Sequence, residues 1–275
     1  MTATKKAFAV FDGDSHVVEP PDLWEKYLEP EYRQLGKHAL WRQDGKLNSY
    51  LRVNGEIFRD TMNPNLPRHA LWRPGMTWES IGELDPHTRH ATNEGAWQPE
   101  IRLSDMDSMG VDQTLLYPTW FAEGFHLVRD PDVAYALARA YNDWIADFCK
   151  AHPRRLKGIA MLNVDDVDEA CQELERIKKL GLVGAFIPVA PLADKPYRHP
   201  IYERLWWTAQ DLDIPLLLHI ATPRHNVPGN EFTINSNEMT GAGRSTTDYW
   251  VRYSLGAMLF AGVFDRYPRL KVGSV

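Results

Sequence analysis

The sequence contains few cysteines and no long hydrophobic run. Its 275 residues include only Cys149 and Cys171, both in segments with a helical pattern, so we predict neither a disulfide nor a cysteine-based metal site. Apolar runs such as Leu255–Ala261 are far shorter than the ~20 residues that span a bilayer. No apolar segment follows Lys5 and Lys6, so no secretory signal is predicted. We expect a cytoplasmic protein with no membrane partner.

Basic residues are also too few for a nucleic-acid-binding surface. The chain has 31 Lys and Arg against 37 Asp and Glu, a net charge of −6, and contains no Lys/Arg-rich run. Binding to a phosphate backbone depends on such positive charge, so nucleic acid is disfavoured as a partner. We expect a small-molecule substrate instead, and leave open a homo-oligomer.

Strand and helix patterns alternate through most of the chain. Amphipathic helix patterns, as in residues 133–148 and 166–180, separate apolar strand-like runs that start near residues 8, 111, 156, 183, 215 and 270. This alternation predicts an α/β fold with a parallel sheet, either doubly wound or a TIM-type (β/α)8 barrel. The first strand leads into Phe11-Asp12-Gly13-Asp14, and neither GxGxxG nor GxxxxGK[ST] occurs. The absence of these phosphate-binding motifs favours the barrel.

Residues 31–100 interrupt this alternation. They are rich in tryptophan and proline, and their one clear signal is a hairpin at residues 49–59 around Asn54-Gly55. We predict a loop-rich insertion between strands one and two that covers the mouth of a single barrel domain, residues 1–275. A surface excursion held by tryptophan packing is the alternative, and it is compatible with this role.

Polar residues occupy the ends of two predicted strands. Asp12, Asp14 and His16 alternate after the first strand, so they share one face. His219 ends the apolar run Pro215–Ile220. Taken separately, the Asp12–His16 segment is explained as a polar strand end, and His219 is explained as a hydrogen-bonded core histidine. Barrel active sites lie at the C-terminal ends of the strands, however, and Asp14, His16 and His219 together predict one divalent metal site there.

Several segments resemble the amidohydrolase-related family of metal-dependent barrel enzymes, which includes aminocarboxymuconate-semialdehyde decarboxylase and the resorcylate- and carboxyvanillate-type decarboxylases. The segments are residues 12–20 (DGDSHVVEP), 102–112 with 116–119, 214–219 and 264–272. The resemblance implies a ligand pair on strand one, which Asp14 and His16 match, and a strand-five histidine, which His219 matches. It also implies an aspartate on strand eight and a further group after strand six.

The last two groups are not found in the sequence as given. Six strands are counted up to Val275, so the barrel is expected to be truncated after strand six, either as a fragment of a longer protein or as an incomplete barrel. The strand-eight aspartate would supply proton transfer, so this chain is expected to be a weak or inactive catalyst. If another side chain supplies the proton, Asp12 and Glu19 are the first candidates.

The resemblance implies a metal-dependent enzyme. We expect hydrolysis of a small organic substrate, carboxylate or aromatic, by metal-activated water, with zinc as the metal and manganese, iron and magnesium as alternatives. Non-oxidative decarboxylation at the same site is the alternative reaction. An inactive fragment or a binding-only pseudoenzyme is the second alternative.

Five further residues are candidates for substrate binding. Trp120 and Phe121 follow the second strand and could wall an aromatic pocket, with plain packing as the alternative. Arg198, Arg224 and His225 follow the fourth and fifth strands and could bind an anionic substrate. Solvated loop charges are the alternative for these three.

Overall fold

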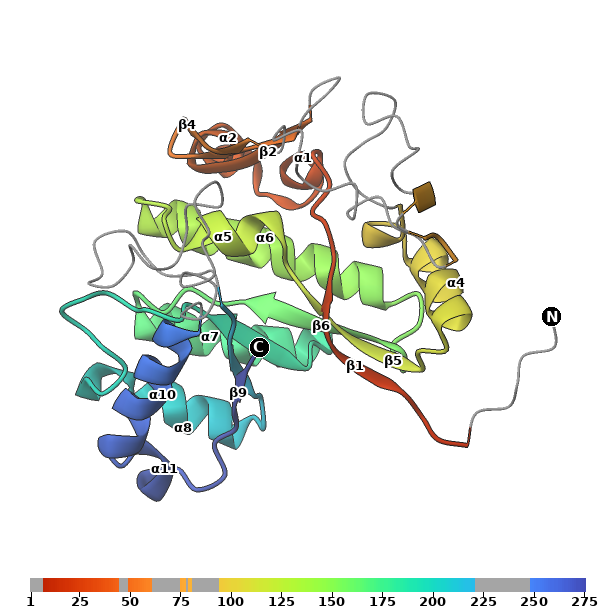
Figure 1. Cartoon of the computed structure of the whole chain (residues 1–275). Coiled ribbons are helices and arrows are strands. Elements are labelled where there is room, and N and C mark those ends of the chain that lie inside the picture. Colours follow the sequence, from red (N-terminus) through yellow and green to blue (C-terminus); the bar gives the residue numbers. More distant parts are fainter. Residues whose placement is uncertain (1–6, 45–48, 61–74, 78, 81–93, 221–247) are drawn as a thin grey trace.

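A sheet of six parallel strands forms the centre of the protein (Figure 1). The computed structural model describes residues 7–44, 49–60, 75–77, 79–80, 94–220 and 248–275. The strands are β1 (Phe11–His16), β5 (Gln113–Tyr117), β6 (Leu156–Met161), β7 (Gly184–Ile187), β8 (Leu216–Leu218) and β9 (Val272–Ser274).

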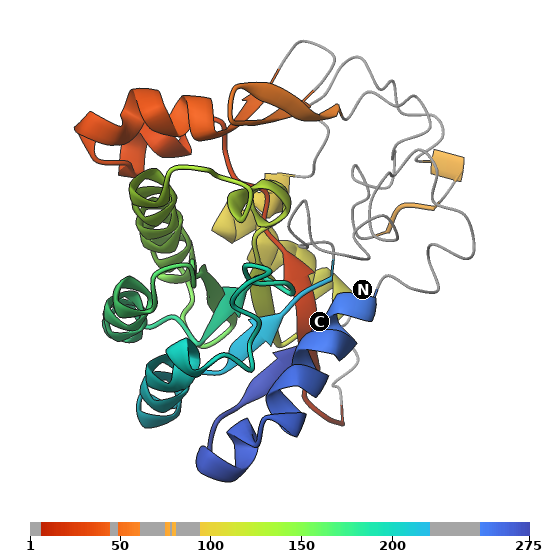
Figure 2. The same cartoon turned by 90° about the vertical axis from the view of Figure 1, so that its left-hand side faces the viewer.

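These strands lie side by side in the order in which they occur in the chain. Each neighbouring pair is parallel, from β1 against β5 to β8 against β9. A doubly wound sheet would change direction at a switch point, and the described strands show none. The sheet curls into a half-barrel (Figure 2). This confirms an α/β fold with six parallel strands, consistent with a truncated TIM-type barrel.

Helices connect successive strands and pack on the outer side of the curled sheet. In Figure 2, α6, α7 and α8 lie on this outer side. The connecting helices are α4 (Pro99–Met109), α5 (Trp120–Phe125), α6 (Pro131–Cys149), α7 (Val167–Leu180), α8 (Glu203–Asp211), α10 (Tyr249–Phe260) and α11 (Val263–Arg266). Short 3-10 turns precede α2, α4 and α8, at Pro30–Tyr32, Glu94–Ala96 and Pro200–Tyr202.

Local sequence signals account for the ends of the two longest helices. Asp130 caps α6 by accepting hydrogen bonds from the N–H groups of Asp132 and Val133. Asp166, rather than the neighbouring Asp165, caps α7 in the same way. Gly181 then ends α7 in the left-handed conformation, with a φ of 84°, which glycine adopts without a Cβ penalty.

The predicted loop-rich insertion is not confirmed. Its described part contains α2 (Arg33–Ala39) and an antiparallel sheet of β2 (Leu40–Asp44), β3 (Ser49–Val53) and β4 (Glu56–Asp60). The Asn54-Gly55 hairpin is confirmed, with φ values of 49° and 84° at its two turn residues. This small sheet packs on α5, where a Cβ added to Gly124 would lie 2.7 Å from Leu40 Cδ1.

The structure corrects the predicted start of strand one and one predicted helix break. Strand one was expected from Phe8, but β1 begins at Phe11 and includes the polar residues up to His16. Strand pairing is made by the backbone, so polar side chains do not exclude these residues from a strand. A helix was expected at residues 248–264 with a break or bend near Gly256 and Gly262. The break occurs at Gly262, with a φ of 69°, whereas Gly256 continues α10.

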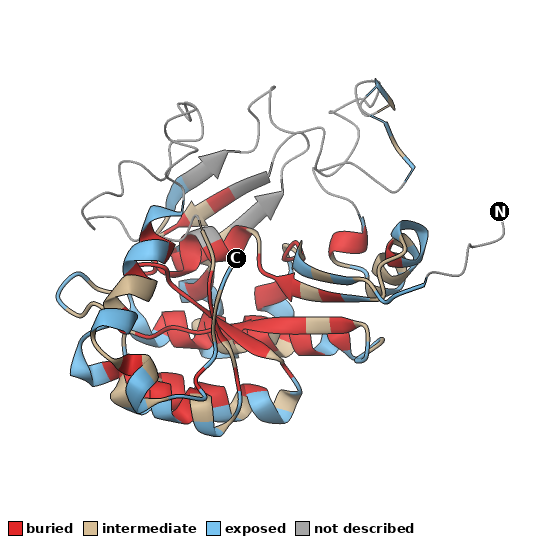
Figure 3. Cartoon of the chain, turned by 60° about the horizontal axis from the view of Figure 1, so that its bottom comes forward, coloured by how far each residue is buried: buried red, intermediate tan, exposed pale blue. Residues whose placement is uncertain are grey.

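One hydrophobic core lies between the sheet and the helices (Figure 3). The central strands β6 and β7 are almost completely buried, as expected for parallel strands covered on both faces. Short helix α1 (Leu23–Tyr27) joins this core through Leu23 and Trp24, each 1% exposed. Within the described ranges, no helix combines the length and the apolar character that crossing a membrane requires.

Candidate metal centre

Asp14 and His16 reach the inner side of the half-barrel from an irregular part of β1. The pairing of β1 with β5 shifts register between Asp12 and Ser15, and it resumes with Ser15 opposite Leu116 and His16 opposite Tyr117. Asp12 does not join the cluster, because its Oδ1 accepts a hydrogen bond from the N–H of Asp14 at 3.2 Å. Asp14 is left exposed, and His16 is partly buried beside it.

His219 follows β8 directly and approaches the same point from the other side. Backbone hydrogen bonds on both sides of it hold this segment to the end of β9: Val275 donates to the carbonyl of Leu218 at 2.9 Å, and Ile220 donates to the carbonyl of Val275 at 3.0 Å. The His219 side chain is only 14% exposed. Residues 203 positions apart in the chain therefore meet at the C-terminal ends of two strands, as predicted.

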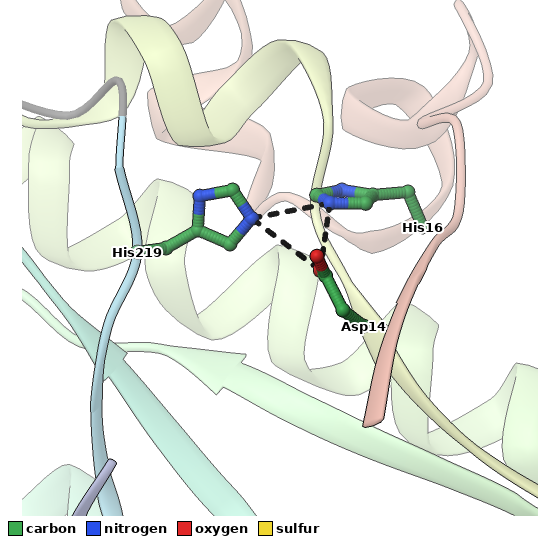
Figure 4. A group of neighbouring side chains, drawn as sticks. All are labelled: Asp14, His16 and His219. Atoms are coloured by element: carbon green, nitrogen blue, oxygen red, sulfur yellow. Dashed lines mark hydrogen bonds and ion pairs between the residues drawn. The ribbon is translucent and has the colours of Figure 1, made fainter. Parts of the chain in front are cut away.

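The three side chains converge on a common point (Figure 4). The Nε2 atoms of His16 and His219 lie 3.2 Å apart. Asp14 Oδ1 lies 3.4 Å from the first and 3.7 Å from the second. Two ligands bound to one ion at ~2.0–2.2 Å in a tetrahedral arrangement are separated by roughly 3.3–3.6 Å. The spacing of the three atoms therefore fits a single small divalent cation.

The hydrogen bonds made by the Nδ1 atoms of the two imidazoles orient their Nε2 atoms toward this point. His16 Nδ1 donates to the carbonyl of Pro118 at 2.9 Å, and His219 Nδ1 donates to the carbonyl of Ile220 at 2.7 Å. A neutral imidazole that donates through Nδ1 presents an acceptor at Nε2. Three acceptors, two nitrogens and one carboxylate oxygen, thus face one another, and a cation would relieve their repulsion.

The protonation of His16 also suits metal binding. Burial lowers its pKa, and the neighbouring His219 lowers it further, while the Pro118 carbonyl and Asp14 act in the opposite direction. The net effect favours the neutral ring at neutral pH. Metal ions bind that form, so the site does not have to lose a proton from His16 first.

Arg102 of α4 fixes the end of β1 that carries the two ligands. Its Nη1 donates to Ser15 Oγ at 3.0 Å, its Nη2 donates to the carbonyl of His16, and its Nε donates to the carbonyl of Gly95 at 2.8 Å. Burial lowers the pKa of the Arg102 guanidinium, while Asp105 and Asp12 raise it. The planar, three-way bonded group acts as a clamp on the irregular segment of β1.

We expect Arg102→Lys to weaken divalent metal binding by roughly 10- to 100-fold, the range seen when groups behind metal ligands are replaced. Lysine keeps the charge but cannot reproduce the forked geometry. Calorimetric titration with Mn²⁺ measures the change, with Arg204→Lys as the control because Arg204 is exposed and pairs with Asp168. Equal affinity in Arg102→Lys and the native chain would contradict this positioning role.

Glu19 lies outside the cluster and serves a different purpose. Its carboxylate is fully buried and accepts hydrogen bonds from the N–H groups of Thr119 at 2.9 Å, Trp120 at 3.0 Å and Phe121 at 3.3 Å. These donors are at the start of α5, so Glu19 joins the segment after β1 to the segment after β5. Burial raises its pKa to about 7, against the opposing effect of the N–H donors.

Aromatic rings surround the buried side of the cluster. The Tyr117 ring centroid lies 5.9 Å from that of His16 and 5.7 Å from that of His219. Phe186 of β7 lies 6.1 Å from His219. Burial raises the pKa of Tyr117, and the charge of Asp14 adds to this effect, so the phenol stays protonated. The cluster therefore combines one exposed carboxylate with an aromatic, largely dry wall.

The candidate substrate-binding residues differ in where they lie. Trp120 and Phe121 are buried in α5, and Phe121 stacks on Trp24 with centroids 4.6 Å apart. Their role as the wall of a substrate pocket stays a prediction. Arg198 is exposed in the loop between β7 and α8, and its role in binding an anion stays a prediction. Arg224 and His225 lie outside the described residues.

Sequence reasoning missed Arg102 and Tyr117. Tyr117 is the last residue of β5, so the strand-end argument applied to His16 and His219 could have included it. Arg102 had no comparable signal beyond its place in a family-like segment. Its partners, two main-chain carbonyls and a serine hydroxyl, are set by tertiary structure alone.

A parallel half-barrel with a carboxylate and two imidazoles at its strand ends has the architecture of metal-dependent barrel enzymes. The model of the Amidohydrolase family matches residues 66–272, well over half of the sequence, and the chain belongs to this family. The resemblance found in the sequence is thereby confirmed.

Among known proteins, gamma-resorcylate decarboxylase of Polaromonas sp. (strain JS666) is 30% identical over 185 residues, which cover 62% of this chain and 53% of the relative. The chain thus spans about half the length of the curated relatives it matches. A crystal structure of an amidohydrolase from Mycobacterium avium subsp. paratuberculosis K-10 has a TM-score of 0.73 at 16% identity, covering 98% of this chain and 72% of that one.

A further structure, a dihydroxybenzoic acid decarboxylase from Polaromonas sp. JS666 with bound manganese and the inhibitor 2-nitroresorcinol, has a TM-score of 0.56 at 22% identity. It covers 97% of this chain and 64% of that one. At these identities the two structures show a shared fold. The predicted zinc is not confirmed, because the ion in this neighbour is manganese.

Proposed function

We propose that this chain provides the metal-binding half-barrel of a decarboxylase that acts on a small aromatic carboxylate. Asp14, His16 and His219 would hold one divalent ion, manganese or zinc. The convergence of their three acceptor atoms carries the proposal. The names of the relatives support decarboxylation over hydrolysis, which the sequence analysis placed first.

The residues at the site suit this chemistry. Decarboxylation breaks the bond between a ring carbon and its carboxylate and releases CO2. The electron pair of that bond stays on the ring carbon, which takes up a proton supplied by water. A bound divalent ion supplies Lewis-acid polarisation of a substrate oxygen. His16 and His219 are held in one tautomer by the Pro118 and Ile220 carbonyls, and Tyr117 and Phe186 exclude water from the buried side.

The proposal also assigns roles to residues 31–100 and to Arg198. Residues 31–100 would cover the mouth of the half-barrel within a single domain, which the packing of β2 and β3 on α5 supports. Arg198, on an exposed loop after β7, would bind a carboxylate of the substrate.

We expect the Mn²⁺-loaded chain to release CO2 from 2,6-dihydroxybenzoate slowly, as a weak catalyst, and the metal-free chain to release none. Carboxyl-labelled substrate allows CO2 to be counted directly. Asp14→Asn weakens one ligand and should abolish the release. Asp22→Asn is the matched control, because Asp22 is an exposed aspartate that pairs with Lys26.

Two results would contradict the proposal. Metal-dependent cleavage of esters or lactones without release of CO2 would restore hydrolysis as the reaction. CO2 release that is equal in the native chain and in Asp14→Asn would remove the cluster from the mechanism.

A further inference from the structure

The Tyr117 hydroxyl is a buried polar group without a visible partner. Tyr117 is 1% exposed, and its hydroxyl makes no hydrogen bond within the part of the chain that the structure describes. A hydroxyl that is buried without a hydrogen bond destabilises the fold, because it has lost its hydrogen bonds to water and gained none in return. Tyr197 and Tyr202, which are equally buried, donate to the carbonyls of Pro188 and Lys195. The lack of a partner at Tyr117 therefore needs an explanation.

The position of Tyr117 beside the cluster explains why its hydroxyl has no partner within the ranges that the structure describes. It ends β5 directly opposite His16 in the strand register, and its ring lies beside the rings of both His16 and His219. The neighbouring wall residue Phe186 has no polar atom in its side chain. A ligand held at the cluster would thus meet three acceptors and, beside them, the Tyr117 hydroxyl, which has no partner among the described residues. An anionic oxygen is the partner that such a donor favours.

We propose that the Tyr117 hydroxyl is a substrate-binding group that donates a hydrogen bond to a carboxylate oxygen of the aromatic substrate at the cluster. This assignment rests on the proposed function, since it needs the carboxylate to be held beside His16 and His219. It makes Tyr117 a determinant of specificity: the site would select a ring that carries a carboxylate over the same ring without one.

Binding measurements on the Mn²⁺-loaded chain test the assignment. Tyr117→Phe removes the hydroxyl and keeps the ring. Its affinity for 2,6-dihydroxybenzoate should fall roughly 10- to 100-fold, the loss expected for a hydrogen bond to a charged group. Its affinity for 1,3-dihydroxybenzene, the same ring without the carboxylate, should not change. Its affinity for Mn²⁺ should also equal that of the native chain, because the three ligands are intact.

Tyr141→Phe is the matched control. Tyr141 of α6 is also fully buried, and its hydroxyl likewise has no partner among the described residues, but its aromatic neighbour is Trp144 rather than a histidine of the cluster. Removing this hydroxyl should leave the binding of both probes unchanged. Neither variant should unfold at lower denaturant than the native chain, since neither loses a hydrogen bond.

The possible negative results separate a failure of the Tyr117 assignment from a failure of the proposed function. Equal affinity of Tyr117→Phe and the native chain for 2,6-dihydroxybenzoate overturns the role of Tyr117 and leaves the proposed function standing. A native chain that binds Mn²⁺ but no carboxylate overturns both. A loss of stability in Tyr117→Phe alone shows that the hydroxyl is bonded within the protein, and a loss of Mn²⁺ affinity shows that it supports the ligands; each overturns the assignment to substrate.

Discussion

Replacing His219 with alanine should lower the affinity for a divalent ion by more than ~100-fold. Groups behind metal ligands change affinity by about 10- to 100-fold, so the loss of a ligand itself should exceed that range. His219 is the least exposed of the three side chains, and it approaches from the opposite side of the half-barrel to Asp14 and His16. Without it, two ligands from one short stretch of β1 remain. Titration with Mn²⁺ measures the change in affinity, with the EPR signal of the free ion reporting how much Mn²⁺ stays unbound.

A matched histidine and a second variant separate metal binding from folding. His199→Ala removes an exposed histidine at the start of a 3-10 turn. This residue is not one of the three converging side chains, so the variant should bind Mn²⁺ as the native chain does. His219→Gln keeps a polar side chain of similar size and should show the same loss as the alanine variant. Native-like affinity in His219→Ala would mean that Asp14, His16 and His219 do not form a metal site.

The strand order and the cluster were predictable because both follow from short-range patterns. Apolar runs separated by amphipathic helices imply parallel strands, and parallel strands bring their C-terminal ends to one edge. His219 and His16 could therefore be placed together although 203 positions separate them. The Asn54-Gly55 hairpin was predictable for a similar reason, since its two left-handed residues are a local requirement.

The features that were missed depend on contacts between distant segments. Nothing near Arg102 in the sequence shows that it donates to the carbonyl of His16, because carbonyls are present at every residue. Glu19 could be read as a catalytic acid, but its three N–H donors lie 100 residues or more further along the chain. Helix α5 itself was not predicted. Its start is bonded by the Glu19 carboxylate, while its own N-cap residue, Thr119, makes no side-chain capping bond.

Glu19→Ala should lower the free energy of unfolding by about 3 kcal/mol or more. The change leaves the N–H groups of Thr119, Trp120 and Phe121 without the Glu19 carboxylate in a buried place, and each unsatisfied donor costs about 1–3 kcal/mol. It also opens a cavity in the packing between β1 and α5. Denaturant unfolding measures the loss, and Glu175→Ala, at an exposed position of α7, is the control. A loss below 1 kcal/mol would show that water or other groups replace the carboxylate.

Glu19→Gln isolates the contribution of the Glu19 charge to the free energy of unfolding. The amide of glutamine resembles a protonated carboxyl group and stays uncharged at every pH. Burial raises the folded-state pKa of Glu19 to about 7 from an ordinary value of 4.5, so the folded chain holds this proton more tightly than the unfolded chain. The stability from Glu19 is therefore fully present below pH 4.5 and is lost as the pH rises through 7. When the pH is raised from 5 to 8, the free energy of unfolding of the native chain should fall by roughly 2–3 kcal/mol relative to that of Glu19→Gln. A difference that moves the other way would mean that the three N–H donors outweigh burial and keep the carboxylate charged at neutral pH.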